Sequence, residues 1–191
     1  MQVMSDKFKS NQEEYTKSLI EAALFVSDKP LNLTKLQQLL SAKELLSKRE
    51  ITQLLEQLKI DYQHRGVELV KVASGYRFQA KAQYSQALAL LFQEKAPKYS
   101  RALLETLSLV AYKQPITRGE IEAIRGVAVS SQIMKTLLEQ QWVKVIGQKE
   151  VAGRPSLYGT TAYFLDHFSL SSLAELPPLT NINAKQKIEL S

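Results

Sequence analysis

The apolar positions in the first half of the chain follow a helical period and then a strand period. One stripe has the i, i+3, i+4, i+7 spacing of an amphipathic helix and comprises Leu19, Ala22, Ala23 and Val26. Two more helical patterns follow, with apolar faces over residues 33–40 and 51–58. Strand-type runs then occupy 67–72 and 76–81, on either side of a Ser-Gly pair. This order predicts three helices followed by a β-hairpin.

The same order of patterns returns in the second half. A helical stripe is formed by Leu103, Leu104, Leu107, Val110 and Ala111. Thr117 and Glu120 have the spacing of a capping box, which predicts the start of a second helix with Ile124 facing inward. Apolar residues over 133–138 indicate a third helix, and two strand-type runs follow it. The second half therefore repeats the supersecondary unit of the first.

A shared tetrapeptide supports the repeat. Leu-Leu-Glu-Gln occurs in both third helices, at 54–57 and at 137–140. Three helices followed by a hairpin is the order of a winged helix. We therefore predict a mainly α fold with small β-hairpins (α+β), built from tandem winged-helix domains. The expected parts are a first domain over 12–92, a linker over 93–98, a second domain over 99–168 and a flexible tail over 169–191.

The composition removes the common routes to catalysis. The chain has no cysteine, which excludes disulfides, thiolate metal sites and thiol nucleophiles. Its two histidines, His64 and His167, are far apart in the sequence and form no metal-binding pair. No glycine-rich phosphate-binding motif occurs. We expect a protein that is not an enzyme and that has no cofactor and no metal.

Hydropathy and charge set the expected location and partners. No apolar run approaches the length of a membrane-spanning helix, and the first residues lack the apolar stretch of a secretory signal. We therefore expect a cytoplasmic protein without membrane contact. The chain has 25 basic and 19 acidic residues, a net charge of +6, which permits weak contact with nucleic acid without demanding it.

The basic residues of the third helices indicate whether the chain is suited to read DNA. Winged helices most often place this helix in the major groove. The third helix of the second half, over 130–141, has one lysine and no arginine. In the first half, Lys48, Arg49 and Lys59 are offset by acidic neighbours. These charges fit a solvated face better than base readout. A winged-helix transcriptional regulator that binds DNA is nevertheless the alternative function.

Two turns of the second half have both a structural and a functional interpretation. The run 153–155 either only makes a turn or presents Arg154 to a partner on a rigid loop. The other turn is either a simple interhelical connection or an aromatic anchor of an interface, and it contains Tyr112, Gln114, Pro115 and Arg118.

The first helix carries more apolar residues than a three-helix core requires, since Leu24, Phe25 and Val26 are consecutive. Each predicted domain is also small, and small domains bury only a modest share of their surface. Such small domains either pack on each other or dimerise, and the apolar first helix favours dimerisation of the first domain through these residues.

Several runs resemble a known family. They are Ala111–Arg118, Ile121–Val127, Gly153–Pro155 and Leu157–Thr161 in the second half, and Ile20–Val26 in the first. Together they are similar to the segregation and condensation protein B (ScpB) family. Its members are the kleisin-associated subunit of the bacterial SMC condensin complex.

The resemblance implies a non-enzymatic subunit of two winged-helix domains that supports chromosome condensation and segregation. It implies a homodimer formed mainly by N-terminal domains, and a C-terminal domain that binds the kleisin ScpA. Contact with the SMC ATPase then runs through the kleisin, and contact with nucleoid DNA is indirect or weak. The candidate kleisin-binding residues are Tyr112, Gln114, Pro115, Arg118, Arg125, Arg154, Pro155 and Tyr158.

Overall fold

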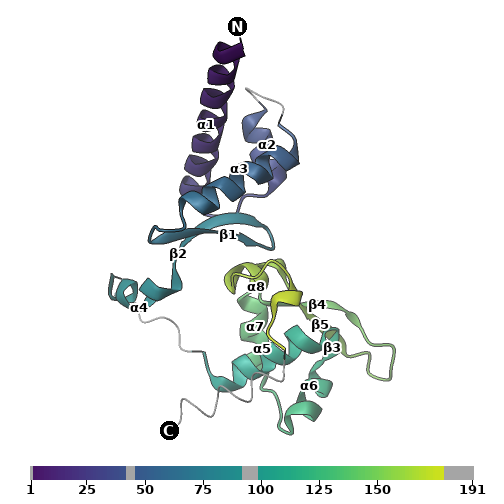
Figure 1. Cartoon of the computed structure of the whole chain (residues 1–191). Helices are drawn as coiled ribbons and strands as arrows, with labels where there is room; N and C mark the ends of the chain where they lie inside the picture. The colour runs from purple at the N-terminus through teal and green to yellow at the C-terminus, as the bar shows by residue number, and fades with distance from the viewer. Residues whose placement is uncertain (1, 42–45, 92–98, 179–191) are drawn as a thin grey trace. The chain divides into compact units, whose positions relative to one another are not determined.

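The computed structural model divides the chain into two compact units, residues 1–95 (unit 1) and 96–191 (unit 2). It describes residues 2–41, 46–91 and 99–178, with side chains from residue 11 onward. Figure 1 traces the two units along the chain. The linker predicted at 93–98 lies outside the described residues.

Unit 1 is a winged helix. Three helices precede an antiparallel hairpin: α1 (Gln2–Val26), α2 (Leu33–Leu40), α3 (Lys48–Asp61), β1 (Val67–Val72) and β2 (Gly75–Ala80). Short helical turns complete the unit: η1 (Ala82–Tyr84), α4 (Ser85–Leu88) and η2 (Ala89–Leu91). The first helix thus starts ten residues earlier than the predicted domain.

Local sequence explains where these elements begin and turn. Ser47 and Glu50 form a capping box that starts α3. Leu31 forms an isolated bridge with Tyr76 at the base of the hairpin. Gly75 allows this approach, because a Cβ there would lie 2.4 Å from the carbonyl of Leu31.

The core of unit 1 contains apolar residues that the sequence predicted on α2 and α3, with Leu36 and Ile51 fully buried. The stripe predicted for α1 is wrong, because Ile20 is its fully buried residue, whereas Val26 of the predicted stripe is 82% exposed. Leu24 belongs to this core as well, with only 4% of its surface exposed. It is therefore not available to a partner chain, which corrects its assignment to a dimer surface. Phe25 and Val26 are exposed.

Unit 2 repeats the winged helix and adds a short strand to its sheet. Its elements are α5 (Arg101–Lys113), β3 (Ile116–Thr117), α6 (Arg118–Arg125), α7 (Ser131–Glu139), β4 (Val143–Gln148), β5 (Ser156–Thr160), α8 (Ala162–His167) and η3 (Leu173–Glu175). The antiparallel sheet has the order β3-β5-β4, so the wing is the β4–β5 hairpin. The predicted tandem winged-helix fold is confirmed.

The core of unit 2 lies between its helices and the base of the wing. Val110, Ile121, Leu137 and Trp142 are fully buried there. The predicted capping box of Thr117 and Glu120 starts α6.

The segment after α8 does not match the tail predicted to be flexible over 169–191. Leu170 and Leu176 pack against the core of unit 2. The hydroxyl of Tyr112 donates a hydrogen bond to the carbonyl of Pro177. The chain therefore packs on unit 2 as far as Pro177, and residues 179–191 lie outside the described part.

Candidate partner-binding site

Helix α5 has a core face and an exposed face. Ser100 caps its first turn by accepting a hydrogen bond from the backbone N–H of Leu103 at 3.2 Å. Leu103 and Leu107 are buried, as predicted. Leu104 was expected in the same stripe but is 41% exposed. It lies beside the stripe, where the core ends and solvent begins.

A groove of about 630 Å³ follows the exposed face of α5 and the end of α6. We call it the α5–α6 groove. Its apolar lining includes Leu104, Leu109 and Ile124. Ile124 was predicted to face inward, yet it is 55% exposed, because α6 contributes only Ile121 to the buried core.

The charged groups of the groove are unevenly paired. The carboxylate of Glu105 accepts hydrogen bonds from Arg101 Nε at 2.9 Å and from Arg125 Nη2 at 3.2 Å. These two bonds, first that of Arg101, lower the pKa of the Glu105 carboxyl. Lys113 lines the other end of α5 and makes no ion pair among the described residues. Three cations and one carboxylate leave the groove with an excess of positive charge.

Arg125 is the most enclosed of these cations. Its side chain is only 9% exposed. Its Nε is buried and has no hydrogen-bond partner within the described part of the chain. Among the described residues, Glu105 is the hydrogen-bond partner of this guanidinium, which lies at the boundary between the core and the groove.

The predicted residue Tyr112 lines the same groove, so the structure brings it together with Arg125. The hydrogen bond from its hydroxyl to the carbonyl of Pro177 places the last described residues of the chain next to the groove.

Gln114 and Tyr158 support the scaffold of unit 2. The Gln114 amide donates to the carbonyl of Ala111 at 3.1 Å and to the hydroxyl of Thr160 at 3.0 Å, and it accepts from the Thr160 N–H at 2.8 Å. It therefore joins the end of α5 to β5. Tyr158 pairs with Ile116 across the sheet and packs against the core. Pro115 is exposed and follows a cis peptide bond.

Arg118 lies on α6, away from the α5 face. It pairs with Glu122 at 3.0 Å and donates to the hydroxyl of Ser131 at 3.3 Å. These bonds link α6 to the first residue of α7.

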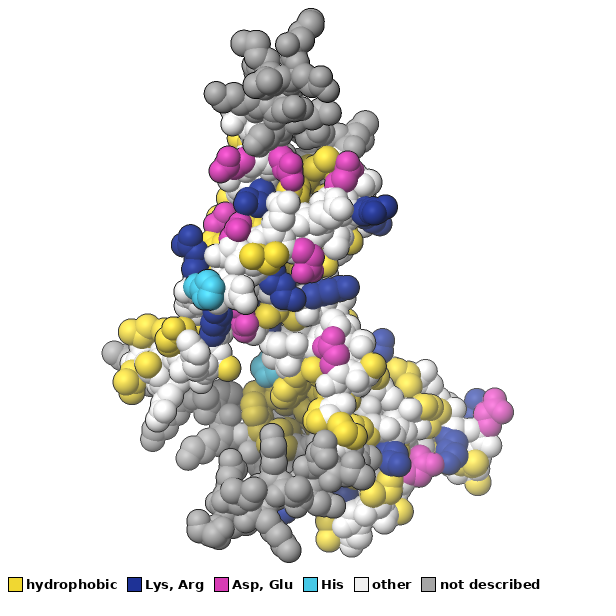
Figure 2. All heavy atoms as spheres, in the orientation of Figure 1, with side chains coloured by type: hydrophobic (Ala, Val, Ile, Leu, Met, Phe, Trp, Pro, Cys, Tyr) yellow, Lys and Arg dark blue, Asp and Glu magenta, His cyan; other side chains and the backbone are white. Residues whose placement is uncertain are grey.

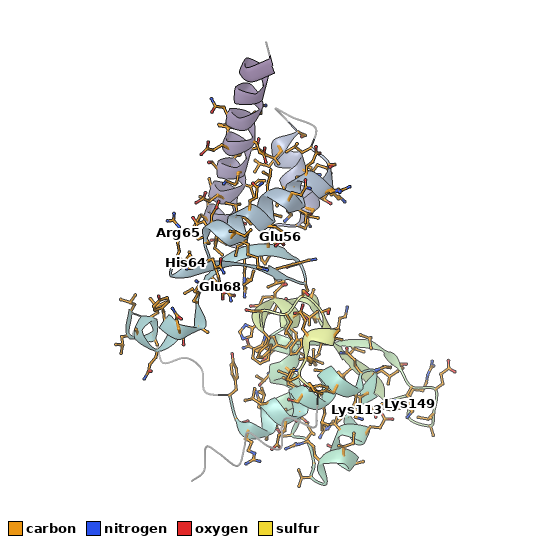
Figure 3. The ribbon with its side chains drawn as sticks, in the orientation of Figure 1. Glu56, His64, Arg65, Glu68, Lys113 and Lys149 are labelled. Atoms are coloured by element: carbon orange, nitrogen blue, oxygen red, sulfur yellow. The ribbon has the colours of Figure 1, made fainter. Side chains whose placement is uncertain are left out.

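Arg154 and Pro155 are exposed in the loop of the wing. Arg154 has a φ of 39° and makes no ion pair within the described chain. The base of this loop is tied to α6, because Lys149 Nζ lies 2.6 Å from Glu120 Oε1. Figure 3 labels Lys113 and Lys149. The eight candidate residues thus divide between the groove, the scaffold, α6 and the wing.

Unit 1 has an aromatic cluster at the end of α1. The ring of Phe25 stacks on Phe78 at 4.3 Å, and Phe78 contacts Tyr62 at 4.6 Å. Tyr62 is buried, whereas Phe25 is 51% and Val26 82% exposed. The exposed apolar surface at the end of α1 therefore consists of Phe25 and Val26.

The third helices carry balanced charge. On α7, Lys135 pairs with Glu139 at 3.7 Å. Figure 2 shows acidic and basic side chains intermixed on the visible face of unit 1. The described part of the chain contains no group of three metal-ligating side chains. It also has no helix long and apolar enough to cross a membrane.

Sequence reasoning missed Glu105 and Ser108 as groove residues. They stand one helical turn apart between the apolar stripe and the solvent face of α5. The available signal was Leu104, an apolar residue directly beside Leu103 at the edge of the stripe.

Two winged helices with balanced third helices and an apolar groove fit the class of interaction proteins better than a reader of duplex DNA. Comparison with known proteins identifies the family. The family model "Segregation and condensation complex subunit ScpB" matches residues 18–179. The chain belongs to the ScpB family.

A relative with high sequence identity agrees with this assignment. The chain is 54% identical over 173 residues to a segregation and condensation protein B homolog of Coxiella burnetii, covering 91% of this chain and 83% of that protein. The crystal structure of ScpB from Mycobacterium tuberculosis is 30% identical, with a TM-score of 0.37, and covers 83% of this chain and 97% of its own. The solved dimer of an ScpB N-terminal domain complexed with an ScpA peptide is 26% identical, with a TM-score of 0.36, and covers 42% and 92%.

Proposed function

We propose that this chain is the non-enzymatic subunit of a bacterial SMC–kleisin complex that binds the kleisin ScpA as a homodimer. In this role it supports chromosome condensation and segregation in the cytoplasm, at the nucleoid. The observation that carries the proposal is the family match, which extends over most of both winged-helix units. The SMC ATPase is then reached through the kleisin.

The two units bind different partners in this proposal, because they expose different surfaces. Unit 1 offers Phe25 and Val26 to a second copy, because both are exposed beside an aromatic stack. Unit 2 offers the α5–α6 groove and the wing to the kleisin. Tyr112, Arg125 and Arg154 are the candidate residues best placed for that contact.

The second candidate is a DNA-binding regulator, which the winged-helix fold itself favours. It requires a basic recognition helix, whereas Lys135 on α7 is matched by Glu139. Binding to duplex DNA by phosphate contact would weaken steeply with salt, because neutralised phosphates release counterions. Salt dependence therefore distinguishes the two functions.

The test is calorimetric titration of the chain with the organism's ScpA, in parallel with a DNA duplex. Arg154→Ala is expected to weaken ScpA binding about ten-fold, the size of a substantial interface contribution. Any affinity for DNA should stay the same. Arg154→Gly separates loss of the side chain from backbone strain at the positive φ. Lys135→Ala, at an exposed position of α7 outside the wing, is the matched control. Loss of DNA binding with intact ScpA binding would contradict the proposal.

A further inference from the structure

We infer that the α5–α6 groove takes an amphipathic helix of the partner, with an apolar face between two acidic positions about three turns apart. The inference rests on the proposed function, because it specifies which kind of kleisin segment unit 2 binds. It is carried by the shape, the exposed apolar residues and the charge of the groove.

The α5 side of the groove is a continuous face along which one partner helix can pack. Its α5 residues recur at three- and four-residue intervals from Arg101 to Lys113, so they form one continuous face of the helix. Twelve residue steps correspond to about 18 Å of helix. Ser108 stands at the middle of this face, and its small side chain lets a partner backbone approach. The Ser108 hydroxyl already donates to the carbonyl of Leu104 at 2.8 Å, so covering it leaves no donor unsatisfied.

Two apolar residues of the groove are exposed to solvent, and a partner helix would bury them. Leu104 is 41% and Ile124 is 55% exposed, and they come from two different helices of unit 2. A partner helix with apolar residues at i, i+3 or i+4, and i+7 would bury both. Burial of such side chains is the main source of affinity in helix-in-groove recognition.

The excess positive charge of the groove favours a partner with acidic side chains. Arg101 and Arg125 share the single carboxylate of Glu105 near one end of the groove. Lys113 lies at the other end and pairs with no acidic group of the described chain. Acidic side chains of the partner near both ends would balance this excess. The spacing between Arg101 and Lys113 sets about 11 or 12 residues between those two acidic positions.

The chain's own C-terminal residues are the competing occupant. Residues 179–191 follow Pro178, next to the bond between Tyr112 and Pro177, and they include Leu179 and Ile182. They carry two lysines and one glutamate, however. Their side chains thus sum to +1 and provide only one acidic group for the two ends of the groove, which favours an acidic partner over self-occupation.

The experiment measures binding of fluorescent peptides tiled along ScpA, and of intact ScpA, to the full chain by anisotropy. Arg101→Glu and Lys113→Glu reverse the charge at the two ends, and Ile124→Gln makes the apolar lining polar. Each is expected to weaken binding of one acidic amphipathic peptide and of intact ScpA about ten-fold. All three sites are exposed, so the fold should be retained, which circular dichroism checks.

Controls and rescue make the result specific. Lys135→Glu and Leu138→Gln alter exposed residues of α7, outside both the groove and the wing, and should leave binding unchanged. Changing one acidic residue of the bound peptide to lysine should restore its affinity for Lys113→Glu. A chain ending at Pro178 should bind as the full chain does.

The outcomes separate this inference from the proposed function. If ScpA binds the unaltered chain and all three groove variants equally, the groove assignment is wrong and the proposed function stands. If binding rises at least ten-fold in the chain ending at Pro178, the groove is occupied by the chain's own C-terminal residues and the inference is also wrong. If the unaltered chain does not bind ScpA, the proposed function itself fails.

Discussion

At the residue scale, Gln114 joins the first helix of unit 2 to the return strand of its wing. Its side chain makes hydrogen bonds with Ala111 and with both the backbone N–H and the hydroxyl of Thr160. Space there is limited, because a Cβ at Gly159 would lie 2.8 Å from Gln114 Oε1. The amide is therefore a structural link next to the candidate site.

Gln114→Ala is expected to destabilise unit 2 by about 1–3 kcal/mol, since it leaves a partly buried donor without a partner. Urea denaturation followed by tryptophan fluorescence measures this, because Trp142 is the chain's single tryptophan and lies in the core of unit 2. Gln132→Ala on the exposed face of α7 should change stability by less than about 0.5 kcal/mol. Equal effects of the two substitutions would contradict the assigned role.

Glu120 is the residue with the clearest dependence on pH. A hydrogen bond from Lys149, together with bonds from Thr117, lowers the pKa of its carboxyl from 4.5 to about 2. The folded state thus favours the ionised form, and the resulting stabilisation is complete above the unfolded pKa. It is lost as the pH falls from about 4.5 to about 2.

Glu120→Gln should therefore lower the urea midpoint of unit 2 at pH 6 and change it little at pH 2. The difference between the two proteins is expected to shrink over the interval between these values. Glu139→Gln, which removes an exposed ion pair on α7, controls for loss of one carboxylate and should have little effect. A difference that stays constant from pH 6 to pH 2 would rule out Glu120 as the source.

At the scale of the element, α5 combines a structural face with a binding face. Leu107 on the core face is 3% exposed, and Leu104 one turn earlier is 41% exposed. The two leucines have the same chemistry and the same helix, so they form a matched pair.

Leu107→Ala should destabilise unit 2 by about 2–5 kcal/mol, because it opens a cavity in a packed core. Leu104→Ala should cost much less stability and instead weaken ScpA binding several-fold. Urea denaturation and calorimetric titration of both variants measure the two effects. A larger loss of stability in Leu104→Ala than in Leu107→Ala would reverse the assignment of the two faces.

The helical period predicted α5 and its core face well, and it predicted the capping box of Thr117 and Glu120. It did not predict which side the boundary residues face. Leu104 and Ile124 lie at the edges of their stripes, where the packing of neighbouring helices decides exposure. On α1 the core face contains Ile20 and Leu24, which the predicted stripe did not include. Periodicity along one helix carries no information about those neighbours.

The candidate site could be predicted only in part, because several of its contacts join residues that are far apart in the sequence. Tyr112 was already a candidate from the turn that contains it, Arg125 was found through the family resemblance, and both line the groove. Glu105 pairs with Arg125, which lies twenty residues further along the chain. Tyr112 holds Pro177, and the two residues are 65 positions apart. Such long-range contacts have no local sequence signal, which is also why the tail was predicted to be flexible.

At the scale of the whole molecule, two small units each combine a packed core with an exposed apolar surface. Unit 1 exposes Phe25 and Val26, and unit 2 exposes Leu104 and Ile124. Exposed apolar surface of this kind is typical of proteins that work within an assembly. Membership of the ScpB family agrees with that interpretation.

The most direct test of the proposed homodimer and its binding to ScpA is multi-angle light scattering of the purified chain, alone and mixed with the organism's ScpA. We expect a mass of twice 21.6 kDa for the chain alone and a larger stable complex in the mixture. A monomer of 21.6 kDa that ignores ScpA and shifts a DNA duplex at moderate salt would contradict this proposal and favour the DNA-binding regulator.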